Sequence, residues 1–275
     1  MKKLMTILAM FAMVGFVSCQ KPADNSKKND EQKEEQKPDD QKPDDQKPDD
    51  QKPDDNPPVE LTIDGSFEDW AGLAKGTYSQ TYGDEEATHP ALTHCKVYAT
   101  AEKIFVYVEW DVEQVSHDPG DPNDLDEWGD PKGKESVPFH CYINTDGNTA
   151  TGGFSDQYAD ASIDVLLEGF IYPDGANVGS YAPGAFAWNG DPNGSGWAWA
   201  ELGDVTCEGA GVDGKYELSI SCADLKGLGF PVADVFSIGF DIQQNWDSVG
   251  VLPNAAPSED NASGVVNSLS VTVQK

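Results

Sequence analysis

Short runs in which apolar and polar side chains alternate recur along the chain from about Val59 onwards. This period of two is clear in KIFVYVEWD, residues 103–111, and it returns in segments 138–144, 161–169, 215–222, 236–243 and 268–274. Such alternation is typical of β-strands, and the Gly, Pro and Asp residues between the runs are typical of turns. Helical periodicity is limited to two single turns, at 67–73 and 223–228. The pattern predicts an all-β fold, an antiparallel β-sandwich of roughly eight to eleven strands.

The first 58 residues lack this pattern. Residues 1–18 have two lysines followed by an apolar run, which is typical of a secretory signal peptide and too short to span a bilayer. Residues 15–19, GFVSC, resemble the lipobox of bacterial lipoproteins, and this resemblance implies that Cys19 becomes the lipidated first residue of the mature chain. An ordinary cleaved signal is the alternative. Because several acyl chains on one residue anchor firmly, we expect an outer-membrane lipid anchor.

Residues 19–58 are predicted to be a disordered, acidic linker that contains proline. They include QKPDD four times in succession, and no repeat contains an apolar side chain that could offset the entropy of ordering. Extended at ~3.1 Å per residue, the linker reaches on the order of 120 Å. Acidic residues soon after Cys19 resemble the signal that places lipoproteins of Bacteroides-type bacteria on the exterior face of the outer membrane. A tether that faces the periplasm is the alternative.

The remaining residues, 59–275, form one predicted domain with a strong negative charge. It has 36 acidic residues against eight lysines and therefore a net charge of −28, and the chain has no arginine. This charge repels nucleic acid and anionic polymers. Without arginine, the chain cannot clamp carboxylate or phosphate groups with two parallel hydrogen bonds. A neutral polysaccharide or oligosaccharide is therefore the expected partner, and nucleic acid is excluded.

Four cysteines lie in the domain. In an exported protein disulfides persist, and we expect the pairs Cys95 with Cys141 and Cys207 with Cys222. The second pair flanks a predicted hairpin around residues 212–214. Four buried free thiols are the alternative.

Residues 61–73, LTIDGSFEDWAGL, resemble the opening of family 9 carbohydrate-binding modules and of related DOMON-like sandwiches, in which Ile-Asp-Gly is followed by Asp-Trp. Residues 103–111, 143–164 and 214–225 are similar to later segments of that family. The resemblance spans the domain and implies a jelly-roll or DOMON-like sandwich. It implies sugar binding in some members, whereas others bind haem or have no known ligand. Haem is not expected here, because all four methionines lie in the signal peptide and Cys-x-x-Cys-His does not occur.

Asn144, Asp146 and Asn148 place oxygen-bearing side chains at alternate positions around a glycine, and Asp160 and Asp164 follow. Calcium prefers six to eight oxygen ligands, which such a loop supplies in part. The similar region of related sandwiches often holds calcium. We therefore predict a structural Ca²⁺ site on Asn144, Asp146, Asn148 and Asp160. The alternative is a turn in which these side chains bond their own backbone.

Tryptophans in loops are the candidates for sugar contact. Trp246 follows a strand-like run and lies beside Asn245 and Asp247, so that an apolar ring meets an amide and a carboxylate, as a sugar ring requires. Trp128 is alone in an acidic loop, where it either folds over the edge of the sandwich or forms an exposed platform. Trp188 opens WNGDPNGSGWAW at the edge of a turn and is the third candidate.

Two further tryptophans, Trp197 and Trp199, share parity in this last segment and are expected in the core. The alternative is that their indoles face a groove.

Catalysis has little support in the sequence. Gly-x-Ser-x-Gly, His-Glu-x-x-His and a phosphate loop do not occur, so neither an enzyme nor a nucleotide cofactor is expected. The expected function is non-catalytic glycan binding through exposed aromatics on a surface lipoprotein, which aids polysaccharide capture beside an outer-membrane uptake complex. The alternatives are an adhesion or assembly lipoprotein that binds a protein partner, and a glycoside hydrolase with two facing carboxylates.

Overall fold

A computed structural model describes residues 59–73, 78–81, 88–115, 123–125, 136–155, 158–172, 181–188, 198–260, 262, 264 and 266–275. The predicted signal peptide, the lipidation site Cys19 and the linker of residues 19–58 lie outside the described residues, as do Trp128 and Trp197. In the described part of the chain, no helix has both the length and the apolar character needed to cross a membrane.

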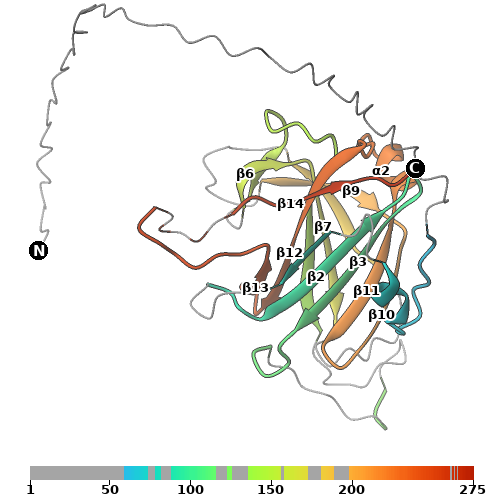
Figure 1. The fold of residues 1–275 in the computed structure, drawn as a ribbon, viewed down its shortest axis with the longest axis vertical. Helices are drawn as coiled ribbons and strands as arrows, with labels where there is room; N and C mark the ends of the chain where they lie inside the picture. Colours follow the sequence, from blue (N-terminus) through green and yellow to red (C-terminus); the bar gives the residue numbers. More distant parts are fainter. Residues whose placement is uncertain are drawn as a thin grey trace, which may run out of the picture. The chain divides into compact units, whose positions relative to one another are not determined.

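Two antiparallel sheets form the domain, and Figure 1 shows their strands as arrows. Sheet A has the order β1 (Tyr78–Thr81), β2 (Leu92–Ala99), β3 (Lys103–Trp110), β11 (Lys215–Ser221) and β10 (Cys207–Val212). Sheet B has the order β13 (Asp247–Leu252), β12 (Val235–Gln244), β4 (Val137–Asn144), β7 (Val165–Ile171), β8 (Gly184–Trp188) and β9 (Trp199–Asp204), and β14 (Leu269–Thr272) also pairs with β12. Strands β5 (Gly153–Ser155) and β6 (Tyr158–Ile163) pair with each other.

The predicted all-β antiparallel sandwich is confirmed. Fourteen strands are described, more than the sequence pattern indicated. The difference comes from short strands such as β1 and β5, whose four and three residues are too few to display a period of two. The two helical turns are also confirmed, as α1 (Glu68–Gly72) and α2 (Cys222–Gly227). Helix α2 begins after Ser221, whose hydroxyl accepts from the backbone N–H of Asp224.

Alternation in the strands places one side of each sheet in the core. In β3, Ile104, Val106 and Val108 belong to the main core cluster, which residues of sheet B such as Phe139 and Phe240 complete. The outer faces of the two sheets are not fully exposed to solvent, because every residue of β4 is buried and β3 is buried over most of its length. Antiparallel sheets often leave one face to solvent, and here additional segments cover parts of both outer faces.

On sheet A, the covering segment is residues 61–73. Leu61 and Trp70 pack with Tyr98, Phe105 and Tyr107 of β2 and β3 in a second buried cluster. This segment therefore covers part of the outer face of sheet A.

On sheet B, β6 lies over part of the outer face. Tyr158 is fully buried, and its hydroxyl donates to the carbonyl oxygens of Phe240 and Leu252 at 2.9 and 2.8 Å. Its ring occupies the space that a side chain at position 239 would need, so that only Gly239 permits this close approach. The rest of this outer face carries the features described below.

The predicted disulfides are wrong, since Cys95, Cys141, Cys207 and Cys222 are buried free thiols. Cys95 lies on β2 of sheet A and Cys141 on β4 of sheet B. The partner of Cys207 in the β10–β11 register is Ile220, and Cys222 comes two residues later. Such diagonal neighbours are about 7–8 Å apart. Neither predicted pair is bonded in the structure.

Candidate functional site

The hairpin that joins β12 to β13 presents Trp246 at its tip. Asn245 and Trp246 lie between the paired residues Gln244 and Asp247, and their φ angles are 51° and 68°. Two central residues with positive φ are typical of a type I′ turn, in which Asn is common. Trp is unusual there, because its Cβ makes the left-handed conformation cost roughly 1–2 kcal/mol. The turn leaves Trp246 62% exposed.

Phe170 on β7 is a second exposed ring beside this tip. It is 49% exposed, its ring centroid lies 6.0 Å from that of Trp246, and the two rings are perpendicular. Edge-to-face contact at this distance is a favourable aromatic geometry. A shallow depression of about 250 Å³ adjoins the two rings, and its other walls are Ser136, Val137, Pro138, Gln244 and Asn245. We call Trp246, Phe170 and this depression the platform.

The platform contains two of the predicted ligand residues, Trp246 and Asn245. Asp247 is the first residue of β13 and pairs with Gln244, but it does not line the depression. Phe170 was missed by the sequence analysis. Its parity in residues 166–170 puts it on the same side of β7 as the polar Glu168, which was a usable signal that this side is not entirely core.

Trp188, the third predicted ligand residue, lies apart from the platform. Ala187 pairs with Val165 at one end of β7, whereas Phe170 is near the other end, roughly 17–20 Å away at ~3.4 Å per residue. Trp188 is half-buried and packs edge-on against Trp199, with ring centroids 5.4 Å apart. It also fills the space beside Gly153, where a Cβ would clash with the indole. Packing therefore accounts for both Trp188 and Trp199.

A row of polar side chains runs across sheet B next to the platform. The strand register places Asp241 of β12 opposite His140 of β4, and His140 opposite Glu168 of β7. The Nε2 atom of His140 lies 3.2 Å from Oε2 of Glu168, and its Nδ1 atom lies 3.9 Å from Oδ2 of Asp241. The first pair is in close contact but lacks the alignment of a hydrogen bond. Asp241 and His140 are buried, whereas the Glu168 side chain is 17% exposed.

Asp241 connects this row to the hairpin of Trp246. Its Oδ2 atom accepts from Nε2 of Gln243 at 2.7 Å and from Oγ of Ser248 at 2.9 Å, and these two residues flank the turn. Its Oδ1 atom is buried and has no hydrogen-bond partner in the described part of the chain. Burial raises the pKa of Asp241 to about 6, against the opposing effects of the Gln243 hydrogen bond and of His140. The Asp241 carboxyl group therefore holds the two residues that flank the turn, and its pKa is raised to about 6.

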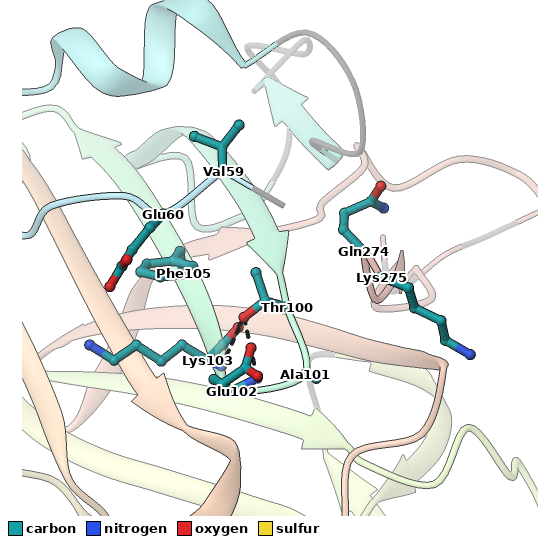
Figure 2. A pocket seen from close by; sticks show the side chains of 9 residues that line it. All are labelled: Val59, Glu60, Thr100, Ala101, Glu102, Lys103, Phe105, Gln274 and Lys275. Carbon is teal, nitrogen blue, oxygen red and sulfur yellow. Dashed lines mark hydrogen bonds between the residues drawn. The ribbon is translucent and has the colours of Figure 1, made fainter. Parts of the chain in front are cut away.

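A larger hollow lies near the start of the described domain. Figure 2 shows its lining side chains, among them Val59, Phe105, Lys103 and Lys275, around a volume of about 470 Å³. Phe105 is only 1% exposed, so its ring face is not free to stack on a ligand. Lys103 pairs with Glu208 at 2.8 Å and Lys275 with Asp234 at 2.7 Å. This hollow is therefore a weaker candidate than the platform for binding a sugar ring.

The predicted calcium loop forms hydrogen bonds to its own backbone. Oδ1 of Asp146 accepts from the N–H of Asn148 at 2.7 Å, and Oδ1 of Asn148 accepts from the N–H of Ala150 at 3.0 Å. Nδ2 of Asn144 donates to Ser162 at 2.9 Å. Within the described ranges, no three His, Cys, Asp or Glu side chains group as a metal site, and the Asp160 side chain lies outside those ranges. The described oxygens therefore do not fit a calcium cage by themselves, and the Ca²⁺ site stays a prediction.

Asp164, between β6 and β7, supports the same loop. Its Oδ2 atom accepts from the backbone N–H and the hydroxyl of Thr145, at 2.8 and 3.1 Å, and from the N–H of Asp146 at 3.3 Å. Burial raises the pKa of Asp164. This carboxylate accepts hydrogen bonds from backbone amides and so stabilises the turn at the end of β4, which is a structural role.

No protein-family model matches this chain, and no curated protein matches it. The resemblance to family 9 carbohydrate-binding modules therefore stays a prediction that depends on the segments quoted above.

Proposed function

We propose that the domain binds a neutral polysaccharide without catalysis, at the platform. The observation that carries this proposal is the perpendicular pair of exposed rings, Trp246 and Phe170, beside the amides of Gln244 and Asn245. A sugar ring has a C–H face that packs on an indole and a rim of hydroxyls that bond to amides. An aromatic surface with polar groups at its border matches both properties.

The strain at Trp246 supports the same proposal. A tryptophan with a φ of 68° is retained against an energetic cost, and such residues cluster at ligand sites because the surrounding structure holds them there. A turn optimised only for folding would have Gly at this position. The conformation instead displays a large aromatic side chain in solvent.

Charge favours a neutral glycan over an anionic one. The domain has a net charge of −28, and the chain offers no arginine for bidentate contact with uronate or sulfate groups. A ligand without charge avoids the repulsion that this field imposes on anions.

Affinity at one platform is expected to be modest. An indole face that covers about 60 Å² contributes roughly 1.5 kcal/mol at ~25 cal/mol/Å². With a few hydrogen bonds, the dissociation constant falls in the millimolar to micromolar range after the costs of association. We propose that many copies, tethered by lipidated Cys19 and the linker on the cell exterior, capture a repeating polymer together for uptake.

Affinity electrophoresis of the full chain tests the proposal, in gels cast with neutral β-glucan, xylan, mannan or starch. We expect at least one polymer to retard the chain, and Trp246→Ala to lose most of that retardation. Val212→Ala removes another exposed apolar side chain, 45% exposed on β10 of sheet A, and should migrate like the parent chain. Failure of every neutral polymer to retard the chain, or equal retardation of Trp246→Ala, would show the proposal to be wrong.

A further inference from the structure

Glu168 lies beside the platform on the same surface. It precedes Phe170 by two residues on β7, so both side chains point to the outer face of sheet B with Cα atoms about 7 Å apart. Its neighbour in the register of β8 is Gly184, and the Phe186 ring lies against the space that a side chain at Gly184 would occupy. Pro138 pairs with Phe170 and His140 pairs with Glu168 in β4. The rings of the platform and this carboxylate therefore follow one another along the sheet.

A buried histidine lies against the carboxylate. His140 is 3% exposed, and its Nε2 atom lies 3.2 Å from Oε2 of Glu168. Nε2 of Gln243 donates to Asp241, which fixes the orientation of that amide, and the same Nε2 lies 3.3 Å from Nδ1 of His140. Because an amide N–H faces Nδ1, Nδ1 acts as the acceptor and the ring N–H is assigned to Nε2, toward Glu168.

The carboxylate retains capacity for a ligand. In the part of the chain that the structure describes, Glu168 has the contact with His140 and no hydrogen bond from another side chain or from the backbone. An ionised carboxylate accepts several hydrogen bonds and donates none, and sugar hydroxyls are suitable donors. Asp241, the other carboxylate beside His140, is fully buried and is not accessible to a ligand. Glu168 is thus the one member of the polar row that reaches the surface.

We propose that Glu168 is a specificity-determining residue of the platform, and that it accepts hydroxyl hydrogen bonds from a sugar unit adjacent to the unit that packs on Trp246. This inference rests on the proposed function. The ring centroids of Trp246 and Phe170 are 6.0 Å apart, and the Cα atom of Glu168 lies about 7 Å farther along β7 than that of Phe170. The distance from Trp246 to Glu168 is therefore longer than one pyranose ring. The ligand class is therefore a neutral oligosaccharide of two or more units with free hydroxyls, and His140 acts as the positioning residue.

Titration calorimetry of the full chain tests the role of Glu168, with the oligomers of one to four units prepared from whichever neutral polymer retards it. Glu168→Ala should weaken binding of oligomers of two or more units about tenfold, since hydrogen bonds to charged groups are the strong ones, and leave single-unit binding unchanged. Glu168→Gln keeps one acceptor oxygen and should lie between. Glu201→Ala, an exposed carboxylate on β9 of the same sheet, is the matched control and should bind like the parent chain.

Two results separate this inference from the proposed function. If Trp246→Ala loses binding while Glu168→Ala binds every oligomer like the parent chain, the inference is wrong and the platform stands. If neither substitution changes binding, or if no neutral polymer is bound at all, both proposals are wrong.

A double-mutant cycle tests the positioning role of His140. His140→Ala should weaken binding of the two-unit oligomer in the parent chain and should have no effect in the Glu168→Ala background, while it lowers the unfolding temperature in both. His140→Gln offers an amide N–H to Glu168 and should bind the two-unit oligomer more tightly than His140→Ala does. If His140→Ala fails to fold, His140→Gln replaces it in the cycle. Equal losses of binding in the two backgrounds would rule out positioning through Glu168.

Discussion

The indole N–H of Trp70 donates to Oε2 of Glu217 at 2.9 Å, and the second oxygen of the same carboxylate accepts the backbone N–H groups of Asp64 and Gly65 at 2.9 and 2.7 Å. Glu217 is fully buried and Trp70 is 2% exposed. The Ile-Asp-Gly and Asp-Trp elements of residues 61–73 therefore meet at one carboxylate of β11. The most distinctive motif of the sequence is a structural device that holds its segment on sheet A.

Glu217→Ala should destabilise the fold severely. The substitution removes the acceptor of the buried Trp70 indole N–H and of the part-buried backbone N–H groups of Asp64 and Gly65, which costs about 3 kcal/mol in the free energy of unfolding. Denaturation by urea measures this quantity. Glu208→Ala is the control, because its ion pair with Lys103 is exposed and should contribute less than about 1 kcal/mol. Similar losses for the two variants would contradict the structural role.

Trp246→Gly should be more stable than Trp246→Ala by about 1 kcal/mol. Both variants lose the ring and its contact with Phe170, but glycine adopts a φ of 68° without the cost that any Cβ imposes. Thermal and urea unfolding compare the two. Both should lose polysaccharide retardation equally, with affinity reduced roughly tenfold for about 1.5 kcal/mol of lost apolar contact. A glycine variant less stable than the alanine variant would mean that the turn is not left-handed at this position.

Asp241 should make stability decrease as the pH rises. Its pKa is raised from 3.8 to about 6 in the fold, so the folded state binds this proton more tightly than the unfolded chain. The resulting stabilisation is present below about pH 4 and is lost as the pH rises through about 6, an effect of about 3 kcal/mol at 1.36 kcal/mol per pH unit. The free energy of unfolding of the parent chain minus that of Asp241→Asn should therefore fall between pH 4 and pH 7.

Asp224 supplies a control of opposite sign for that experiment. Hydrogen bonds from Thr206 lower the pKa of Asp224 below its usual value of 3.8. Its contribution is present above that value and is lost as the pH falls, so the difference curve for Asp224→Asn should slope in the other direction. A flat curve for Asp241→Asn would show that its carboxyl is not desolvated.

The four domain cysteines should resist alkylation in the native chain. Burial raises the pKa of Cys207 to about 12 and that of Cys222 to about 11, and only the thiolate reacts with iodoacetamide. Peptide mapping after treatment at pH 8 should find all four thiols unmodified in the folded chain and alkylated once urea unfolds it. Recovery of a peptide pair linked through Cys207 and Cys222, without any reductant, would reinstate the disulfide.

Sequence patterns predicted correctly those features that the local backbone determines. The period of two identified the long strands β3, β4, β11 and β12, because alternation is fixed by the pleat of the backbone itself. The same pattern did not show that both faces of β4 are buried, since the cover comes from segments such as β6 that are distant in sequence. Pairing of cysteines failed for the same reason, because it depends on which sheet each strand joins.

Trp246 and Trp188 show which properties of a side chain follow from the sequence and which depend on the tertiary structure. The sequence by itself determined that Trp246 follows a strand beside Asn245, and that Trp188 lies at the edge of a turn. Only the tertiary structure decided that Trp246 is exposed against Phe170, and that Trp188 packs on Gly153 and Trp199. Parity along a strand fixes the face of the sheet to which a side chain points. Whether that face meets water or another segment depends on long-range packing, which no local pattern contains.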